Sequence, residues 1–367
     1  MPPSRSLITP SSNPLLERAL REKLLRRTEV AGSLGELEPL ALRLGLMLGT
    51  LKPRLHQPQL VVFAADHGLA VDGLAGPGQR TTQEQVQQLL AGRWPMAVYA
   101  RTQDIGLSVV DCGLAADVAA HDRLLMRKIA HGTRNTRVGP AMSLDQAHAA
   151  MRAGMEIGDS LRGNMLMCAG LGVGANESAA LVLSRLTDAP VRELAFAGPR
   201  MTADQIAHLM VVLQGAQGRH RAVVDPVEVL AAFGGFEVAV MVGVMLVAAS
   251  KRHLLMVDGL PACAALMIAA RIATPVTDYC VFCRSHSHRG LDRALALFRA
   301  SALLELGLES ADGTGAALAW PLVRNAAALL TDVADGEDPG PTHPGAMSPA
   351  TGAVPFELPA QEAAPPA

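Results

Sequence analysis

The sequence has few charged residues and no stretch of concentrated charge. Asp, Glu, Lys and Arg make up 18% of its 367 residues, the formal net charge is -2, and no run of Lys or Arg is longer than a pair. Proteins that bind nucleic acid or an anionic membrane by charge need a clustered basic surface. We therefore expect no nucleic acid and no membrane among the partners, and a small molecule as the ligand.

The chain also lacks a hydrophobic run long enough to cross a bilayer. Its most apolar run, residues 238–249, is well short of the roughly 20 residues that a membrane-spanning helix needs, and we expect a buried helix there. Residues 1–13 contain no apolar core of the kind found in secretion signals. The five cysteines are odd in number and lie in apolar segments, which favours buried thiols over a disulfide framework. These absences predict a cytoplasmic protein.

Hydrophobic residues, in contrast, make up half of the chain, so it can bury a large core. Short apolar runs alternate with helix-like segments, and most of the runs end in Asp, Gly, Ser or His. The runs are residues 60–65, 108–111, 165–169, 254–258 and 279–283. This alternation predicts an α/β fold: a mostly parallel sheet with helices on both faces, in which ligands bind beyond the carboxyl ends of the strands.

A glycine-rich segment, GLGVGANES at residues 170–178, follows one of these strands and precedes a helix. Its backbone N–H groups could hold a phosphate. The alternative is an ordinary turn capped by Asn176, with Glu177 complementing the helix dipole. Since a carboxylate would repel a phosphate, the residues alone favour the turn. The glycine spacing also differs from that of a Rossmann dehydrogenase.

Three further polar segments are candidates for chemistry. Asp312, in a DGTG turn before a helix that Pro321 is expected to kink or restart, is either a general base or an N-cap. The segment GTRNTR at residues 132–137 suits phosphate or ribose oxygens, or is a solvated loop. Asp66 and His67 are adjacent at a strand end, so their side chains point in opposite directions and at least one is structural.

A CxxC pair at residues 280 and 283, followed by His286 and His288, superficially resembles a zinc site. The cysteines lie within an apolar strand, and the second half of a structural zinc pattern is absent. We therefore expect no metal.

Several segments, in order, resemble one family, the nicotinate-nucleotide:dimethylbenzimidazole phosphoribosyltransferases. They are GSLGELE at residues 32–38, FAADHG at 63–68, GTRN at 132–135, PAM at 140–142, GGFE at 234–237, VDG at 257–259, SH at 285–286 and GTGAALA at 313–319. The resemblance spans residues 30–333 and implies an enzyme that transfers ribose phosphate from nicotinate mononucleotide to dimethylbenzimidazole or a related aromatic base. The products are nicotinate and α-ribazole phosphate, for the lower ligand of cobalamin.

The resemblance also implies the domain organisation. We expect a small helical domain from residues 1–50 with part of 305–333, a Rossmann-like large domain over 51–304, and a homodimer. Beyond residue 333 the composition, rich in Pro, Gly, Ala and acidic residues, predicts a disordered tail over 334–367. No cofactor is expected.

The implied site residues fall into two groups. Asp312 matches the family's general-base Glu and is the expected catalytic residue, with Glu309 as a second candidate if the turn is rearranged. The implied substrate-binding residues are Asp66, Gln85, Gln88, Gly132, Thr133, Gly172, Gly174, Ser285, Gly313 and Thr314.

Two loops depart from the family pattern. In one, Asp312 replaces the general-base Glu; in the other, Gly170 replaces a second active-site Glu and Ala-Asn-Glu at residues 175–177 replaces Asn-Thr-Thr. An alternative therefore stays open: a catalytically weak or inactive paralogue that binds nucleotide or base as a partner or regulatory protein.

Overall fold

The computed structural model describes residues 8–74, 79–195, 201–285 and 289–334. Within these residues, seven strands form one sheet in the order β3-β2-β1-β4-β5-β6-β7, and every neighbouring pair is parallel. The strands are β1 (Gln59–Ala65), β2 (Gly106–Gly113), β3 (Leu124–Met126), β4 (Met165–Leu171), β5 (Leu254–Val257), β6 (Cys280–Arg284) and β7 (Ala302–Leu304). The predicted α/β fold with a parallel sheet is confirmed.

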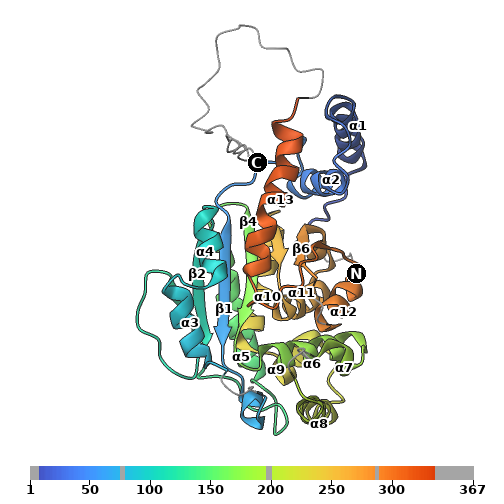
Figure 1. Ribbon diagram of the computed structural model, residues 1–367. Helices are drawn as coiled ribbons and strands as arrows, with labels where there is room; N and C mark the ends of the chain where they lie inside the picture. Colours follow the sequence, from blue (N-terminus) through green and yellow to red (C-terminus); the bar gives the residue numbers. More distant parts are fainter. Residues whose placement is uncertain (1–7, 75–78, 196–200, 286–288, 335–367) are drawn as a thin grey trace, which may run out of the picture.

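Helices cover both faces of this sheet (Figure 1). On the near face lie α3 (Thr82–Leu90), α4 (Pro95–Thr102) and α13 (Thr314–Thr331); on the far face lie α5 (Leu144–Ser160), α10 (Phe236–Ser250) and α11 (Leu260–Ile272). The central strands are therefore buried on both sides, which explains why they are continuous apolar runs without alternation.

Helix α10 contains the most apolar run of the sequence. Twelve of its fifteen residues are buried, and it packs against β1, β2, β4 and β5 as well as α5. Helices α5 and α10 approach closely at two glycines: a β-carbon on Gly154 or Gly243 would lie 2.0 Å from a carbonyl oxygen of the other helix. The prediction of a buried helix over residues 238–249 is confirmed.

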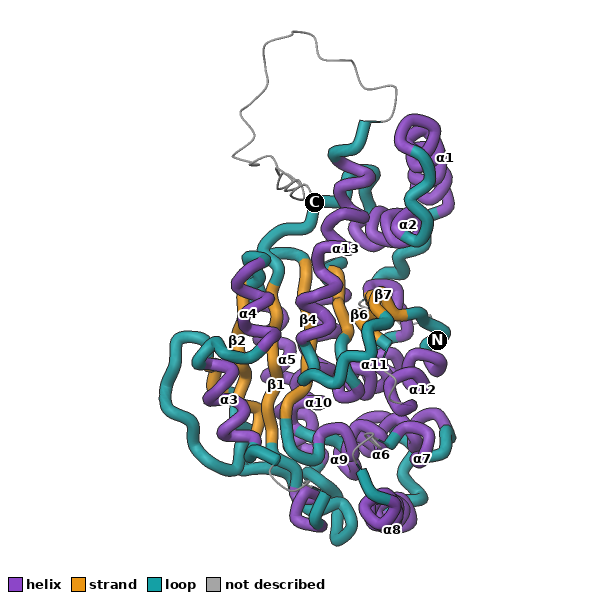
Figure 2. Tube along the Cα trace, in the orientation of Figure 1, coloured by secondary structure: helices purple, strands orange, loops and turns teal. Residues whose placement is uncertain are grey.

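The remaining helices lie at the two ends of the sheet. At the amino-terminal end of the strands, α1 (Pro14–Ala31) and α2 (Leu37–Leu48) pack against α13 and project from the body in Figure 2. The other end carries α6 (Ala175–Thr187), α7 (Val191–Leu194), α8 (Ala203–Arg219), α9 (Pro226–Phe233) and α12 (Arg289–Leu297), with a short 3₁₀ helix at Gly68–Asp72. A second 3₁₀ helix, Thr274–Tyr279, directly precedes β6 and lies at the amino-terminal end of that strand. The division into domains at residues 50 and 304 stays a prediction.

Three local predictions were wrong or lie outside the described residues. Helix α13 runs without interruption through Pro321, which excludes the restart, while the alternative of a kink stays a prediction. The N-cap of α6 is Gly174 and not Asn176, which lies in the first turn. The tail beyond residue 334 and the loop residues His286 and His288 are outside the part of the chain that the structure describes.

Candidate active site

A cleft of about 200 Å³ opens at the carboxyl ends of β4, β5 and β6. This is the edge where a parallel sheet presents loops to a ligand. Its walls come from five loops and helix starts: Gln79, Gln85, Gly170, Leu171, Gly172, Ala175, Asn176, Gly259, Leu260, Pro261, Arg284, Leu291, Glu309, Ser310, Ala311 and Asp312. Both expected catalytic carboxylates, Asp312 and Glu309, lie in this cleft.

Asp312 belongs to a chain of three charged side chains at the cleft. The Arg284 guanidinium donates from Nε to Asp258 Oδ1 (2.6 Å) and from Nη2 to Asp312 Oδ1 (2.8 Å). Asp258 and Arg284 are buried, with 0% and 4% of their side chains exposed, whereas Asp312 keeps 16%. Of the three, Asp312 is the most exposed to a ligand in the cleft.

Asp258 performs the capping role that the sequence left open for Asp312. Its Oδ2 accepts hydrogen bonds from the backbone N–H groups of Gly313 (2.7 Å) and Ala316 (3.0 Å) at the start of α13. The N-cap residue of this helix is Gly313, which has no side chain that could accept a hydrogen bond from the first turn. Asp312 is thus not an N-cap, and its carboxylate is directed to Arg284 and the cleft.

The surroundings of Asp312 suit proton transfer at neutral pH. Burial raises the pKa of its carboxyl group from 3.8 to about 7, Arg284 opposes this increase, and Asp258 adds to it. A general base is most effective when its pKa lies near the working pH. Asp312 can therefore accept a proton from a ligand in the cleft.

A second cavity, of about 460 Å³, adjoins the first and shares Gln79, Gly172 and Asn176 with it. Its other walls are Gly73, Leu74, Val173, Gly174, Glu177, Met201, Asp204, Gln205, His208 and Leu209. The described lining includes two carboxylates, Glu177 and Asp204, and no Lys or Arg. Desolvation raises the pKa of Glu177. The two neighbouring cavities provide room for two substrates.

The glycine-rich loop after β4 forms the wall between these cavities. A β-carbon on Gly170 would lie 2.5 Å from Cβ of Pro261, and one on Gly172 would lie 2.1 Å from the carbonyl oxygen of Ala65. The loop is thus close-packed against α11 and the end of β1. At residue 170, where the family pattern has a second Glu, this chain has no space for a side chain without rearrangement.

His67 has a structural role. It forms a buried ion pair with Glu237 of the GGFE segment, with 3.1 Å between Nε2 and Oε1, in a geometry that is not that of a hydrogen bond. Burial alone would lower the pKa of His67, but the close contact with the charged Glu237, together with the charges of Glu177 and Asp66, outweighs this effect and the pKa is raised. The pair joins the end of β1 to the start of α10, beneath the loop that lines the cavities.

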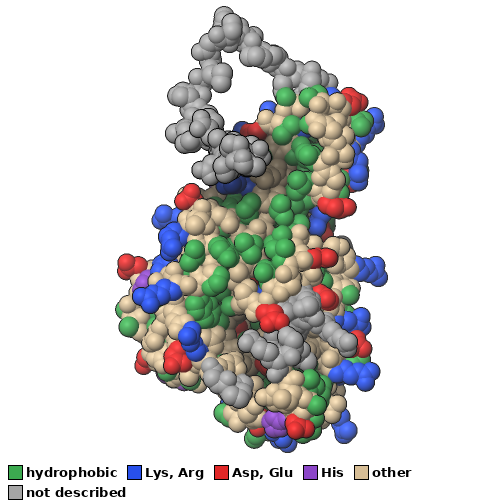
Figure 3. Space-filling model, viewed as in Figure 1, with side chains coloured by type: hydrophobic (Ala, Val, Ile, Leu, Met, Phe, Trp, Pro, Cys, Tyr) green, Lys and Arg blue, Asp and Glu red, His purple; other side chains and the backbone are tan. Residues whose placement is uncertain are grey.

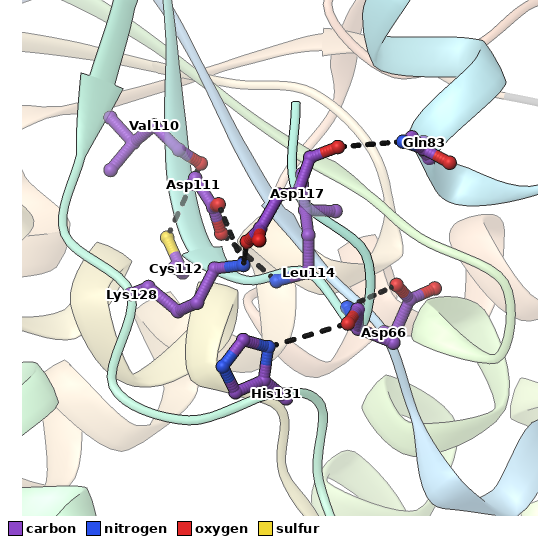
Figure 4. Close-up of polar contacts among 10 residues, drawn as sticks. Asp66, Gln83, Val110, Asp111, Cys112, Leu114, Asp117, Lys128 and His131 are labelled. Carbon is purple, nitrogen blue, oxygen red and sulfur yellow. Dashed lines mark hydrogen bonds and ion pairs between the residues drawn. The ribbon is translucent and has the colours of Figure 1, made fainter. Parts of the chain in front are cut away.

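Asp66 also holds backbone in place, as Figure 4 shows. Its Oδ2 accepts from the N–H of Ala115 at 2.8 Å. Nearby, Lys128 lies between the buried Asp111 (3.5 Å) and the exposed Asp117 (3.0 Å) and fixes the connection between β2 and β3. None of these residues lines either cavity.

The GTRNTR segment, residues 132–137, is also held by hydrogen bonds to neighbouring parts of the chain. The N–H of Gly68 donates to Thr133 Oγ1 (3.2 Å), while Arg137 and Asn135 both bind the carboxylate of Asp72. The hydroxyl of Thr136 is buried and donates to the carbonyl of Ala232. In this structure the segment supports the loop after β1.

The structure brings together some of the expected site residues and not others. Asp312, Glu309, Gln85, Gly172 and Gly174 line the two cavities. The residues outside both are Asp66, Gln88, Gly132, Thr133, Ser285, Gly313 and Thr314. Gln88 instead accepts from the indole N–H of Trp94, and the backbone N–H of Ser285 donates to Leu304 in β7.

Sequence reasoning missed Arg284 and the wall of the second cavity that α8 provides. One signal existed for Arg284, a single charge directly after the apolar run 280–283 and before the SH segment. The cavity walls from α8 carried no such signal, since Asp204 and His208 read as the polar face of an ordinary helix.

Comparison with known proteins identifies the family and supports the fold. A family model described as phosphoribosyltransferase matches residues 9–340. Nicotinate-nucleotide–dimethylbenzimidazole phosphoribosyltransferase of Cupriavidus taiwanensis is 41% identical over 324 residues, which cover 88% of this chain and 92% of the relative. The chain belongs to this phosphoribosyltransferase family. The enzyme of the same name from Janthinobacterium sp. is 37% identical over 333 residues, 90% of this chain and 96% of the relative.

A solved structure from the same family has a similar fold. The crystal structure of the nicotinate-nucleotide–dimethylbenzimidazole phosphoribosyltransferase from Thermus thermophilus superposes with a TM-score of 0.80 at 30% identity, covering 87% of this chain and 96% of that one. The resemblance inferred from the sequence segments is confirmed. In the described residues, no helix has the length and hydrophobicity to span a membrane.

Proposed function

We propose that this protein transfers the phosphoribosyl group of nicotinate mononucleotide to dimethylbenzimidazole or a related aromatic base. Membership of the family supports the reaction class, and the names of the relatives include both substrates. The observation that carries the proposal is the Asp312 carboxylate, which faces the first cleft with a pKa of about 7.

The chemistry requires little else from the protein. One ring nitrogen of the acceptor attacks the anomeric carbon of the ribose, and the bond from that carbon to the pyridinium nitrogen breaks with inversion. The bonding electron pair returns to the pyridinium ring, so nicotinate leaves without an acid. The N–H proton of the acceptor's other ring nitrogen passes to Asp312.

The two cavities provide a place for each substrate. We propose that the aromatic base occupies the first cleft, next to Asp312, and that the nucleotide occupies the second, with Gln79, Gly172 and Asn176 between them. Leu260, Pro261 and Leu291 provide apolar surface for a flat ring in the first cleft. Gln85 lines the same cleft and is a candidate for orienting the base.

Release of nicotinate tests this function directly. Purified protein is mixed with nicotinate mononucleotide and a panel of benzimidazoles, and nicotinate and the ribosylated base are measured together by chromatography. Equal amounts of both products support transfer, whereas nicotinate without a ribosylated base indicates hydrolysis.

One observation favours the alternative of a catalytically weak paralogue that acts as a binding partner. The second cavity places Glu177 and Asp204 where the nucleotide is proposed to bind, and carboxylates repel a phosphate. Calorimetric titration with nicotinate mononucleotide separates the two functions. Binding without turnover for any base in the panel favours the partner function.

We also propose that the protein is a cytoplasmic homodimer. Figure 3 shows hydrophobic side chains gathered over α13 and α4, where the partly exposed residues include Val98, Tyr99, Leu318 and Leu322. Its five cysteines are buried and unpaired, as expected in a reducing compartment. Light scattering at micromolar concentration tests the dimer, and a monomeric mass contradicts it.

A further inference from the structure

Arg284 makes four polar contacts from one buried guanidinium. Besides the carboxylates of Asp258 and Asp312, its Nη1 donates to the backbone carbonyl oxygens of Leu308 (3.0 Å) and Ser310 (3.2 Å). Only 4% of the side chain is exposed. A planar guanidinium with a fixed set of donors can satisfy several acceptors in one geometry, which a lysine ammonium cannot.

These contacts connect three separate parts of the chain. Asp258 follows β5, Arg284 ends β6, and Leu308, Ser310 and Asp312 lie in the irregular loop between β7 and α13. A loop without regular secondary structure does not by itself hold a side chain to the accuracy that catalysis requires. Here Arg284 attaches that loop to the sheet through Leu308 and Ser310, the residues on either side of the exposed Glu309.

We propose that Arg284 is the positioning residue of this active site, a clamp that holds the Asp312 carboxylate at the cleft by sharing one guanidinium between Asp258 and Asp312. The proposal rests on the proposed function, in which Asp312 is the general base. Arg284 acts through Asp312 and is not itself a catalytic residue.

The charged and titratable groups around Asp312 determine how Arg284 affects its protonation. The groups that face it are Arg284 from β6, Asp258 after β5, Cys263 from α11 and Glu309 from its own loop. Asp258 is fixed by two backbone N–H groups of α13 in addition to Arg284, so its charge is stabilised from two sides. Arg284 is the cation that favours the ionised, proton-accepting form of Asp312.

The test uses Arg284→Met, which removes the charge at similar length, and Arg284→Lys, which keeps the charge but not the fork of donors. Arg324→Met is the matched control, because Arg324 is exposed on α13 and lines neither cavity. Two quantities are measured for each protein: the pH profile of kcat/KM for nicotinate release, and the titration of the Asp312 carboxyl carbon by ¹³C NMR, assigned by comparison with Asp312→Asn.

In Arg284→Met, we expect the titration midpoint of Asp312 to move to higher pH by about one unit or more, and the acid limb of the pH profile of kcat/KM to move with it. At pH values below the wild-type midpoint, kcat/KM should therefore fall about tenfold. In Arg284→Lys, the midpoint is expected to stay near the wild-type value while kcat falls about tenfold or more, since the base is misplaced but still paired. Arg324→Met is expected to match wild type in both quantities.

A folded Arg284→Met whose Asp312 midpoint does not move overturns the proposal. If Arg284→Met does not fold, Arg284→Lys decides, and wild-type kcat in that variant overturns it. The NMR titration needs no turnover, so a wild-type protein that is inactive with every base refutes the proposed function while the clamp is still tested.

Discussion

The carboxyl group of Asp312 lies directly against the Cα atom of Gly259. A β-carbon at residue 259 would come within 2.0 Å of Asp312 Cγ, and the φ angle of +94° at Gly259 is one that residues with side chains rarely adopt. In the VDG segment, Asp258 thus caps the start of α13, and Gly259 contacts the candidate base, Asp312. Neither role could be read from the segment without the fold.

Gly259→Ala is expected to lower kcat/KM about a hundredfold, because the new methyl group pushes Asp312 away by on the order of 1 Å. Its free energy of unfolding should fall by about 1–3 kcal/mol from backbone strain. Steady-state kinetics and urea denaturation measure the two effects. Gly218→Ala is a suitable control, because a β-carbon there meets nothing within 4 Å. Wild-type kinetics in Gly259→Ala would show that the position of Asp312 does not matter.

Asp312→Glu is expected to lower turnover as well, by up to about a hundredfold. Asp312 already reaches Arg284 at 2.8 Å and packs on Gly259, so an additional methylene must displace one of them. The family's Glu is therefore not interchangeable with Asp in this chain. Turnover equal to or above wild type in Asp312→Glu contradicts this reading of the site.

The same buried carboxyl group predicts a pH-dependent stability. Because the folded pKa of Asp312, about 7, is above its unfolded value near 3.8, the folded state binds the proton more tightly. Stability conferred by the protonated form is present at low pH and is lost as pH rises from about 4 to 7. Asp312→Asn cannot titrate, so its melting temperature relative to wild type should increase between about pH 4 and pH 7 and level off above that range. A difference that stays constant with pH counts against the raised pKa.

Much of the fold followed from the sequence because its physical causes are local. Short continuous apolar runs such as 60–65, each followed by a turn residue, are typical of strands covered on both faces, and the longer run 238–249 is typical of a buried helix. The short edge strands β3 and β7, of three residues each, gave no comparable pattern and were not predicted. Their pairing depends on the neighbouring strands and not on their own composition.

The candidate site was predicted only in part. Asp312 was found because it matches the position of the family's general-base Glu, and the glycine-rich loop was found because it follows a strand and precedes a helix. Arg284 was missed because its role depends on two carboxylates distant in the sequence, and no spacing rule connects residues 258, 284 and 312. Asp66 and Thr133 have functional residue types, yet their observed partners are backbone groups.

The buried pair of His67 and Glu237 gives a further prediction. Glu237→Gln leaves a buried imidazole without its charge partner, and we expect a loss of about 3 kcal/mol in the free energy of unfolding. Because the folded pKa of His67 is raised, the stability from its protonated form is present below pH 6.5 and is lost as pH rises through the folded value. The loss in Glu237→Gln should thus be larger at about pH 6 than at about pH 9 in urea denaturation. The exposed Glu29→Gln is the control, and equal losses at both pH values would argue against a charged pair.

The most direct test of the account is the pH dependence of nicotinate release in the presence of dimethylbenzimidazole, measured for wild type, Asp312→Ala and the exposed control Asp122→Ala. A carboxylate base must be ionised to accept a proton, so wild-type kcat/KM should rise with pH and reach half its maximum near the Asp312 pKa of about 7. Asp122→Ala should give the same profile, and Asp312→Ala should lose at least about a hundredfold with no inflection near pH 7. An Asp312→Ala protein that releases nicotinate at the wild-type rate, with the wild-type profile, would contradict the assignment of Asp312 as the general base.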